Sequence, residues 1–378
     1  MKIGVMTIPF NNNYGGYLQA FALITTLKSL GHDAVLINRM PQNWPLFRRV
    51  RYFIKSLIKV ILLRKCDSLF LSKERSIQRK GRLMLKFVDS YIPKTKPVRS
   101  SRELSKLTKS SFDVVVFGSD QLWRPDYVPN ITDFFGAFLK RRNVCRIAYA
   151  ASFGNGNPQY TEKERVQCGK EISKFRSISL RESSGLDVIK KMKWKTVRPE
   201  IVLDPTMLLD VECYNSKMFE KKSESVSKLF CYVLDSSNEA EKIIKRVSEV
   251  SDLDVYNIID SKLWKCADYL LPPIEDWICG IRDAAFVITD SYHGTVFSIL
   301  FNKPFAVCVN KKRGADRFFS LLEQFGLMDR IVCSEGDAER VWKKKIDWIA
   351  VNEAIQIKRK ASLDFLKNAL NICESGAV

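Results

Sequence analysis

The sequence predicts an α/β protein made of two domains that face each other across a cleft. The chain has 378 residues, 46% of them apolar, which is enough for a sizeable core and longer than a single domain usually runs. Short apolar runs alternate with amphipathic stretches, as in parallel, doubly wound sheets. The alternation stops at the polar segment Lys217–Lys228 and then begins again, so this segment is the expected linker.

Six apolar runs in the first half are expected to form strands, and most precede a loop and an amphipathic stretch. They are Lys2–Ile8, Asp33–Met40, Asp113–Asp120, Arg146–Ser152, Ser177–Glu182 and Ile201–Thr206. A basic helical insertion, about residues 44–110, follows the second strand. The first domain is therefore expected to cover residues 1–215.

The second half predicts a second domain over residues 216–350. Its expected strands are Leu229–Asp235, Val255–Asp260, Ala285–Ser291 and Pro304–Asn310, with helices near Glu239–Val250, Ile274–Arg282, Gly294–Phe301 and Arg317–Phe325. Residues 351–378 are predicted as a C-terminal helix that could pack back on the first domain.

The charge of the chain is strongly positive and unevenly distributed. Lys and Arg number 62 against 42 Asp and Glu, and Arg48–Lys86 alone holds 13 basic residues against Asp67 and Glu74. A solvated helical face would explain this segment, and so would an anionic partner such as a lipid surface, a phosphorylated substrate or nucleic acid.

Among these partners we favour a membrane surface, because apolar side chains lie among the cations as they do in helices that lie in the membrane plane. These side chains are Phe53, Ile54, Leu57, Ile58, Ile61 and Leu62. Lys55 and Lys59 make the run too charged to span a bilayer. Since no recognised binding motif accompanies the charge, we expect no nucleic-acid partner.

The cysteines and the N-terminal sequence predict a cytoplasmic protein with reduced thiols. The first residues lack the charged, apolar and small-residue regions of a secretory signal. The ten cysteines are scattered without a CxxC pair, so we expect buried thiols rather than disulfides or a zinc site. They are Cys66, Cys145, Cys168, Cys213, Cys231, Cys266, Cys279, Cys308, Cys333 and Cys373. Asp252 and Asp254 form a DxD pattern in a polar loop, and we expect neither a metal nor a cofactor.

Polar residues follow several of the predicted strands, where ligands bind in open parallel sheets. They are Asn11–Gly16, Gly118–Gln121, Ser152–Gly154, Arg181 with Glu182, Asp204, and Asp290–Thr295. None of these sequences is a GxGxxG or a P-loop, so nucleotide binding has no motif to support it.

His293, one of only two histidines, lies in DSYHGT, where a predicted strand passes into a helix near Gly294. The unpaired N–H groups and positive dipole of a helix start suit a phosphate or carboxylate. His293 could donate a proton beside that anion, or it could simply cap the helix.

Three charged strand-end residues leave similar alternatives open. Arg181 must pair with Glu182, with another internal carboxylate or with a substrate, because a buried guanidinium needs an anion. Asp120 could be a helix cap or a general base. Asp204, which precedes a proline, is expected to be a turn residue more than a base.

Six strings, in this order, resemble the polysaccharide pyruvyl transferase family. They are NNNYGGYLQAFAL, VVVFGSDQLW, YAASFG, SLRESSGLDVI, VLDPTMLL and TDSYHGTVFSILFNKPF, from near the N-terminus to the second domain. The resemblance implies a glycosyltransferase-B-like pair of Rossmann-like domains. It also implies transfer of pyruvate from phosphoenolpyruvate, the donor substrate, onto two hydroxyls of a sugar as a cyclic ketal, in capsule or exopolysaccharide biosynthesis and often on a lipid-linked acceptor.

The resemblance also implies a set of site residues. His293 and Asp120 would be catalytic, and the substrate-binding residues would be Arg181, Ser291, Tyr292, Gly294, Thr295, Asn13, Tyr14, Gly15, Gln19 and Ser119. Some members have an arginine where this chain has Ser291, so the second cationic contact would come from elsewhere, with Lys311, Lys312 and Arg313 as candidates by position. A sugar-nucleotide glycosyltransferase and a membrane-associated scaffold without activity are the alternatives.

Overall fold

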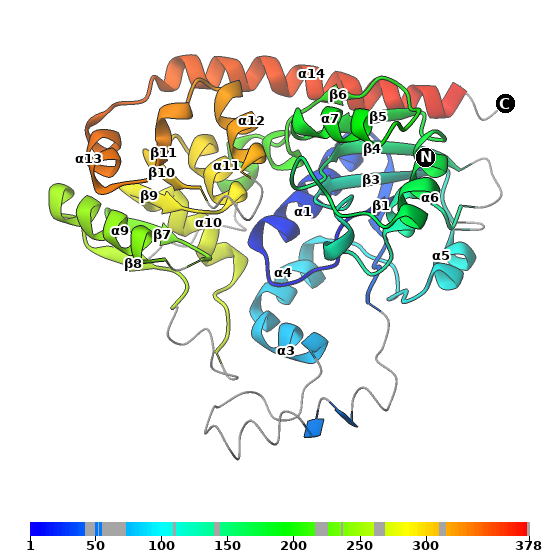
Figure 1. Cartoon of the computed structure of the whole chain (residues 1–378), viewed down its shortest axis with the longest axis horizontal. Helices are drawn as coiled ribbons and strands as arrows, with labels where there is room; N and C mark the ends of the chain where they lie inside the picture. The colour runs from blue at the N-terminus through cyan, green and yellow to red at the C-terminus, as the bar shows by residue number, and fades with distance from the viewer. Residues whose placement is uncertain are drawn as a thin grey trace.

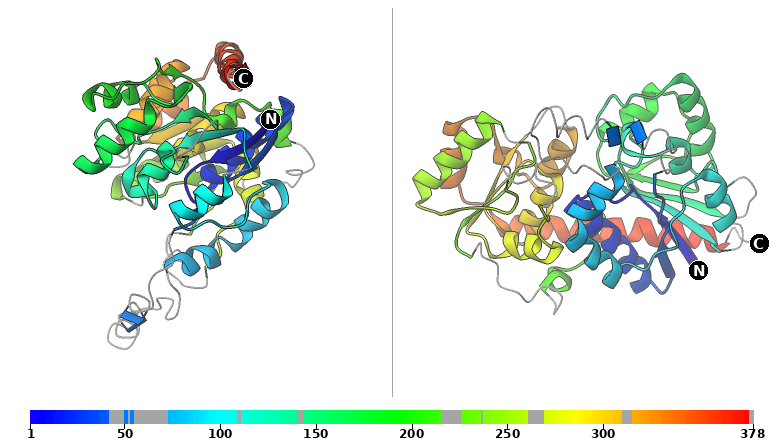
Figure 2. Two further views of the ribbon diagram at one scale, coloured as in Figure 1. Left: turned by 90° about the vertical axis from the view of Figure 1, so that its right-hand side faces the viewer. Right: turned by 90° about the horizontal axis from the view of Figure 1, so that it is seen from below.

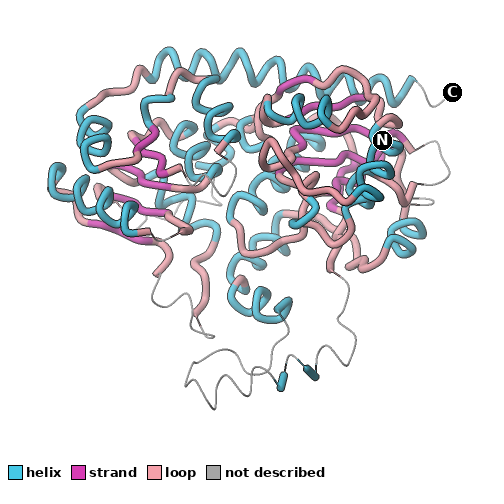
Figure 3. Tube along the Cα trace, in the orientation of Figure 1, coloured by secondary structure: helices cyan, strands magenta, loops and turns pink. Residues whose placement is uncertain are grey.

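The computed structural model describes residues 1–41, 50–51, 53–54, 73–108, 111–139, 144–215, 226–235, 237–260, 269–309 and 315–375. Much of the basic segment Arg48–Lys86 and most of the expected linker therefore lie outside the described residues. The strands form two separate groups, and helices surround each group (Figure 3). Among the described residues, no helix combines the length and the apolar character needed to cross a membrane.

The first sheet is parallel and has the strand order β2-β1-β3-β4-β5-β6. Its strands are β1 (Lys2–Met6), β2 (Asp33–Leu36), β3 (Val114–Asp120), β4 (Cys145–Ala151), β5 (Ser177–Leu180) and β6 (Glu200–Ile201). Its helices are α1 (Tyr14–Ser29), α3 (Lys73–Lys80), α4 (Arg82–Tyr91), α5 (Ser101–Leu107), α6 (Glu162–Ile172), α7 (Ser184–Lys191) and α8 (Val211–Asn215), with a short 3₁₀ turn η3 (Pro205–Met207) after β6. The central strand β3 is buried along its whole length, which explains its continuous apolar sequence.

The second sheet is also parallel, with the order β11-β10-β9-β7-β8. Its strands are β7 (Leu229–Tyr232), β8 (Val255–Asn257), β9 (Phe286–Thr289), β10 (Phe305–Cys308) and β11 (Ile331–Val332). Its helices are α9 (Asn238–Ser251), α10 (Ile274–Asp283), α11 (Tyr292–Leu300), α12 (Asp316–Gln324) and α13 (Glu335–Lys343). Two parallel sheets covered by helices give the predicted α/β architecture.

The two sheets share one hydrophobic core that includes residues of both. Helix α1 of the first sheet contacts α11 of the second. Tyr14 lies at this junction: its ring stacks on Trp277 with 5.4 Å between centroids, and its hydroxyl donates to the Pro272 carbonyl at 2.9 Å. The halves are therefore packed together through α1 rather than joined only by a linker.

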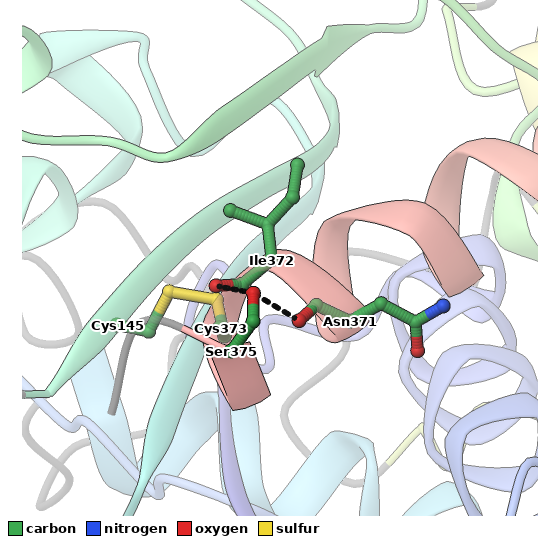
Figure 4. Close-up of a disulfide and its surroundings, with 5 residues drawn as sticks. All are labelled: Cys145, Asn371, Ile372, Cys373 and Ser375. Atoms are coloured by element: carbon green, nitrogen blue, oxygen red, sulfur yellow. Dashed lines mark hydrogen bonds between the residues drawn. A yellow bond between two sulfur atoms is a disulfide. The ribbon is translucent and has the colours of Figure 1, made fainter. Parts of the chain in front are cut away.

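Helix α14 (Trp348–Ser375) passes over both sheets, from the side of α12 to the side of β6 (Figures 1 and 2). Near its end, Cys373 forms a disulfide with Cys145 at the start of β4, with 5.7 Å between the Cα atoms (Figure 4). The prediction that these two thiols are reduced is therefore wrong. They are 228 residues apart in sequence, so no spacing pattern could reveal the pair. Cys213 and Cys333 are exposed, which also differs from the prediction of a buried thiol.

Candidate active site

A cluster of buried charged side chains lies at the carboxyl ends of β3 and β5 and in the loop that follows β6. Arg181, at the end of β5, occupies its centre, and its side chain is 1% exposed. One guanidinium nitrogen, Nη2, donates to Asp120 Oδ1 at 3.0 Å, and the other, Nη1, donates to Asp204 Oδ2 at 2.9 Å. Glu182 Oε2 lies 3.8 Å from Arg181 Nε, too far for a hydrogen bond. Three carboxylates of the first sheet thus surround one arginine.

The second sheet adds His293 and Tyr292 to this cluster, from the first turn of α11. His293 is buried, and its Nε2 lies 3.4 Å from Asp204 Oδ2. The Tyr292 ring lies under the Arg181 guanidinium, with 4.3 Å from Cζ to the ring centroid. The structure therefore brings together four residues that the sequence placed after three separate strands: Asp120, Arg181, and the neighbours Tyr292 and His293.

Gly15 allows α1 to approach His293 closely. A Cβ atom at position 15 would lie 1.9 Å from His293 Nδ1, so any other residue would displace the imidazole. Asn13 fixes the start of α1, because its side chain accepts a hydrogen bond from the Gly15 N–H at 3.1 Å. Gly15 and Asn13 therefore define the start of α1, against which the His293 imidazole packs.

Gln19 and Ser119 support the end of β3 through internal hydrogen bonds. Ser119 donates to Gln19 Oε1 from both its backbone N–H and its hydroxyl, each at 3.0 Å. Gln19 Nε2 in turn donates to Thr7 Oγ1 at 2.9 Å. The next residue, Asp120, has a φ of +72°, a left-handed conformation that non-glycine residues rarely adopt. Such outliers concentrate at functional sites.

The start of α11 is capped by its own chain. Ser291 Oγ accepts from the Gly294 N–H at 3.3 Å, and the Ser291 carbonyl accepts from the Thr295 N–H at 3.0 Å. The amides of Gly294 and Thr295, which the sequence predicts as part of an anion cradle, are therefore bonded within the helix start. Tyr14, another predicted binding residue, contributes to the packing between the two sheets described above.

The charged cluster favours the ionised forms of Asp120 and Asp204, the two aspartates that the first sheet contributes. Burial would raise the pKa of Asp120, but the positive charges of Arg181, His293 and Arg317 outweigh it and lower that pKa. Asp204 behaves alike: burial opposes ionisation, yet the imidazole and Arg181 bring its pKa below the usual range. The pKa of Glu182 is instead raised, with burial as the main cause. Two carboxylates of the cluster are thus stabilised as anions, whereas burial makes the third harder to ionise than an ordinary glutamate.

Four polar atoms of the cluster have no hydrogen-bond partner within the described part of the chain, although each is buried. They are Asp120 Oδ2, Arg181 Nε, Glu182 Oε2 and His293 Nε2. Buried polar groups are nearly always satisfied, so several unsatisfied ones within one cluster indicate a place for a ligand. The cluster therefore has the capacity to bind and to exchange protons.

Arg317, on α12, is a cluster residue that sequence reasoning missed. It is buried, and its Cζ lies 5.7 Å from the centroid of the Tyr292 ring. Burial and the nearby Arg181 lower its pKa. The predicted candidates Lys311, Lys312 and Arg313 lie outside the described residues. A hint was available, because Arg317 lies only four residues after Arg313 in the sequence.

Asp204 does more than form the turn that the sequence predicts. As predicted, it caps a turn, since its Oδ1 accepts from the Thr206 N–H at 3.0 Å. Its other oxygen, Oδ2, contacts both Arg181 and His293 and thereby links the two halves of the cluster.

A cavity of about 460 Å³ lies between the end of β6, α12 and α14. It is lined by Ser183, Ile201, Val202, Leu203, Ser320, Glu323, Gln324, Ile357, Lys358, Ala361 and Ser362. Its walls combine hydroxyl and amide groups and the charged side chains of Glu323 and Lys358 with aliphatic groups. In the described ranges, no three His, Cys, Asp or Glu side chains are grouped as a metal site would require, and Asp252 instead ends α9.

Three solved structures with a similar fold contain bound nucleotide sugars. UDP-GlcNAc 2-epimerase from Neisseria meningitidis, bound to UDP-GlcNAc, has a TM-score of 0.51 and 7% identity, covering 96% of this chain and 100% of that one. The Methanocaldococcus jannaschii UDP-GlcNAc 2-epimerase, in complex with UDP-GlcNAc and UDP, has a TM-score of 0.51, 12% identity and coverage of 94% and 99%. UGT71G1 from Medicago truncatula, complexed with UDP-glucose, has a TM-score of 0.50, 11% identity and coverage of 100% and 98%. At such low identity these likenesses establish the glycosyltransferase-B-like fold alone.

Comparison at the level of sequence identifies the family. A search among curated proteins finds no match to this chain. The sequence profile of polysaccharide pyruvyl transferases, however, matches residues 13–312, which include the whole buried cluster apart from Arg317. The chain therefore belongs to the polysaccharide pyruvyl transferase family.

Proposed function

We propose that the protein transfers the pyruvyl group of phosphoenolpyruvate onto two hydroxyls of a sugar, as a cyclic ketal, in bacterial surface polysaccharide biosynthesis. The observation that carries this proposal is the buried cluster in which His293 of one domain meets Asp204 of the other, which Arg181 links to Asp120. It combines positive charge for an anionic donor with groups that can give and accept protons.

The donor requires positive charge. Phosphoenolpyruvate carries about three negative charges at neutral pH, because both its phosphate and its carboxylate ionise. Arg317 and the positive end of α11 would supply this charge from the second domain, and Arg317 would take the place of the arginine that some family members have at position 291. Arg181 already binds two carboxylates. The role of Arg181 would be to hold these two carboxylates and to add positive charge through Nε, the guanidinium nitrogen that binds neither of them.

In this proposal His293 and Asp120 carry out the proton transfers. His293 in its protonated form gives a proton to C3 of the donor, and Asp120 accepts the proton of the first sugar hydroxyl as its oxygen bonds to C2. The bond from C2 to the phosphate oxygen then breaks, and the electron pair leaves with the phosphate, which takes the proton from Asp120. The second hydroxyl traps the resulting oxocarbenium ion and returns its proton to His293. A diol and phosphoenolpyruvate thus become a ketal and inorganic phosphate.

The cavity of about 460 Å³ would receive the sugar acceptor. Three of its lining residues, Ser183, Leu203 and Ser320, belong to the segments that carry Arg181, Asp204 and Arg317. Hydroxyl and amide groups among aliphatic side chains suit a neutral, polyhydroxylated ligand. A large residue at Ser320 should therefore weaken acceptor use more than donor binding.

The basic segment Arg48–Lys86 is proposed to hold the protein at an anionic membrane surface, at the inner face of the cell membrane, where a lipid-linked acceptor would lie. Reversal of several of its charges should reduce binding to anionic liposomes and spare turnover of a soluble acceptor. An equal loss of both would place the segment in the active site instead.

A second candidate function is sugar transfer from a nucleotide donor, which the UDP-sugar complexes with the same fold favour at the level of fold alone. A scaffold without activity is a third. The buried unsatisfied atoms of Asp120 and His293 argue against a scaffold, because a structural cluster has no need to leave them unsatisfied.

The test is an acceptor screen. The purified protein is incubated with phosphoenolpyruvate and a panel of soluble and lipid-linked saccharides, and both phosphate release and the mass of each saccharide are measured. We expect phosphate release only with saccharides that gain a pyruvyl ketal, and loss of both in His293→Asn. The matched control is His32→Asn, which changes the other histidine of the chain. Transfer from a UDP-sugar, without any consumption of phosphoenolpyruvate, would contradict the proposal.

A further inference from the structure

The loop that presents Asp204 has little support from its own sheet. It follows β6, a strand of two residues at the edge of the first sheet, and it contains only the short turn η3. Yet Asp204 Oδ2 has to lie within about 3 Å of Arg181 and near His293 at the same time. Something outside the sheet must hold the loop in place.

Helix α14 makes direct contacts with this loop on both sides of Asp204. Before it, the Leu203 N–H donates to Ser362 Oγ at 3.0 Å. After it, the buried guanidinium of Arg359 donates to the Met207 carbonyl at 2.7 Å and to the Leu209 carbonyl at 3.1 Å. Arg359 also binds the carboxylate of Asp210. Carbonyls at the end of a helical turn lack partners within the turn, and here one planar guanidinium satisfies two of them.

The other side-chain hydrogen bonds to the backbone of the loop come from two tyrosines of the first domain, and η3 also packs against α1 and α11. The Tyr149 hydroxyl donates to the Leu203 carbonyl at 3.1 Å, and the Tyr214 hydroxyl donates to the Thr206 carbonyl at 2.9 Å. Both are single neutral hydrogen bonds, whereas Arg359 provides charge-assisted ones at three points. Helix α14 is itself anchored at its far end by the disulfide between Cys145 and Cys373 (Figure 4).

We propose that Arg359 and Ser362 are positioning residues of the active site: from α14 they hold residues 203–210 so that Asp204 meets Arg181 and His293 together. The consequence for turnover rests on the function proposed above. The positional claim does not, because it concerns only where Asp204 lies relative to the imidazole. A displacement of about 1 Å would separate Asp204 from one of its two partners, and such misplacement can cost about a hundredfold in rate.

The two histidines of the chain give a readout that needs no substrate. In protein labelled with ¹³C and ¹⁵N at histidine, His293 reports the position of Asp204, and His32, which lies by the N-terminus, serves as an internal reference. Asp204→Asn defines the direction in which the His293 cross-peaks move when the carboxylate is lost. We expect Arg359→Lys and Ser362→Ala to move them part of the way in that direction at pH 7.

A control variant, a stronger variant and a check of folding complete the experiment. Lys360→Ala removes an exposed charge from the same helix and should leave both histidine signals unchanged. Arg359→Ala is a stronger variant, and if it fails to fold, Arg359→Lys and Ser362→Ala still decide the matter. Circular dichroism and melting temperature establish that each variant is folded.

With an acceptor in hand, we expect kcat to fall about tenfold or more in Arg359→Lys, with the KM for phosphoenolpyruvate nearly unchanged. Folded Arg359 and Ser362 variants whose His293 cross-peaks coincide with those of the wild type would overturn the proposal. If the wild type consumed no phosphoenolpyruvate with any acceptor, the proposed function would fail, while the NMR comparison would still decide whether α14 positions Asp204.

Discussion

The carboxyl ends of the two sheets contribute different chemistry to the same cluster. The first sheet supplies three carboxylates around one guanidinium: Asp120, Glu182 and Asp204 around Arg181. The second supplies His293, Tyr292 and Arg317. Its own strand-end acid, Asp290, instead accepts hydrogen bonds from the Leu234 and Asp235 N–H groups at 2.7 and 2.9 Å. An aspartate at a strand end is therefore a site residue in one sheet and a support for a turn in the other, and the residues that lie opposite make the difference.

The largest effect is expected from Arg181→Ala, which leaves three buried carboxylates without their shared cation. Loss of one partner of a buried ion pair costs about 3–5 kcal/mol of unfolding free energy, because a charge stays buried and unpaired. Urea unfolding measures this. The matched control is Arg246→Ala, which removes an arginine from the more exposed pair with Glu339 and should cost much less, because solvent screens that pair. Equal losses in the two variants would show that the cluster does not depend on Arg181.

Asp120→Asn and Asp290→Asn compare the two strand-end acids directly. We expect Asp120→Asn to lower kcat by about 10²- to 10⁴-fold, because the amide cannot accept the proton of the acceptor hydroxyl. Asp290→Asn should lower the unfolding free energy by about 1.5–3 kcal/mol, through weaker bonds to two backbone N–H groups, and leave kcat nearly unchanged. Steady-state kinetics and urea unfolding of both variants measure the contrast. A comparable loss of kcat in Asp290→Asn would mean that the second sheet also supplies a catalytic acid.

The smallest effect is a difference in pH dependence between two carboxylates of the first sheet. The pKa of Glu182 is raised above its ordinary value of 4.5, so its contribution to stability falls as pH rises through and above that value. Glu182→Gln should therefore gain stability relative to the wild type above about pH 4.5. Asp204 has a lowered pKa, so its contribution is present above its ordinary value of 3.8 and is lost on acidification. The deficit of Asp204→Asn should accordingly shrink as pH falls.

Urea unfolding of both variants between about pH 3 and pH 8 tests these opposite slopes. The account requires the two difference curves to have opposite signs near neutral pH. If Glu182→Gln were less stable than the wild type at pH 7 and equally stable at pH 4, Glu182 would be an ionised partner of Arg181 like the other two carboxylates.

Local sequence was sufficient for the parts of this site that lie on consecutive strands. Buried parallel strands read as apolar runs, and their polar ends must meet at one edge of a sheet, so Asp120 and Arg181 could be brought together from sequence. The junction at His293 was recognisable for the same reason. The family resemblance then joined the two halves, which no local pattern could do.

The rest depended on packing between segments that are far apart in sequence. Arg317 reaches the cluster only because α12 packs beside α11, and the rotation of a helix about its axis is not readable from a single arginine. Asp204 was predicted to be a turn residue, and one of its carboxylate oxygens does accept a hydrogen bond within a turn. Its other oxygen lies near His293 of the second domain, a contact between segments far apart in sequence. The disulfide of Cys145 and Cys373 joins a strand and a helix 228 residues apart, so its formation depends on where α14 lies.

The most direct test of the central claim is a calorimetric titration of the wild-type protein with phosphoenolpyruvate and, separately, with UDP-glucose and UDP-GlcNAc. The account predicts that phosphoenolpyruvate binds and that Arg317→Ala weakens its binding at least tenfold, about 1.4 kcal/mol, while Arg246→Ala does not. Binding of a UDP-sugar together with no heat from phosphoenolpyruvate would contradict the account and assign the cleft to a nucleotide-sugar donor.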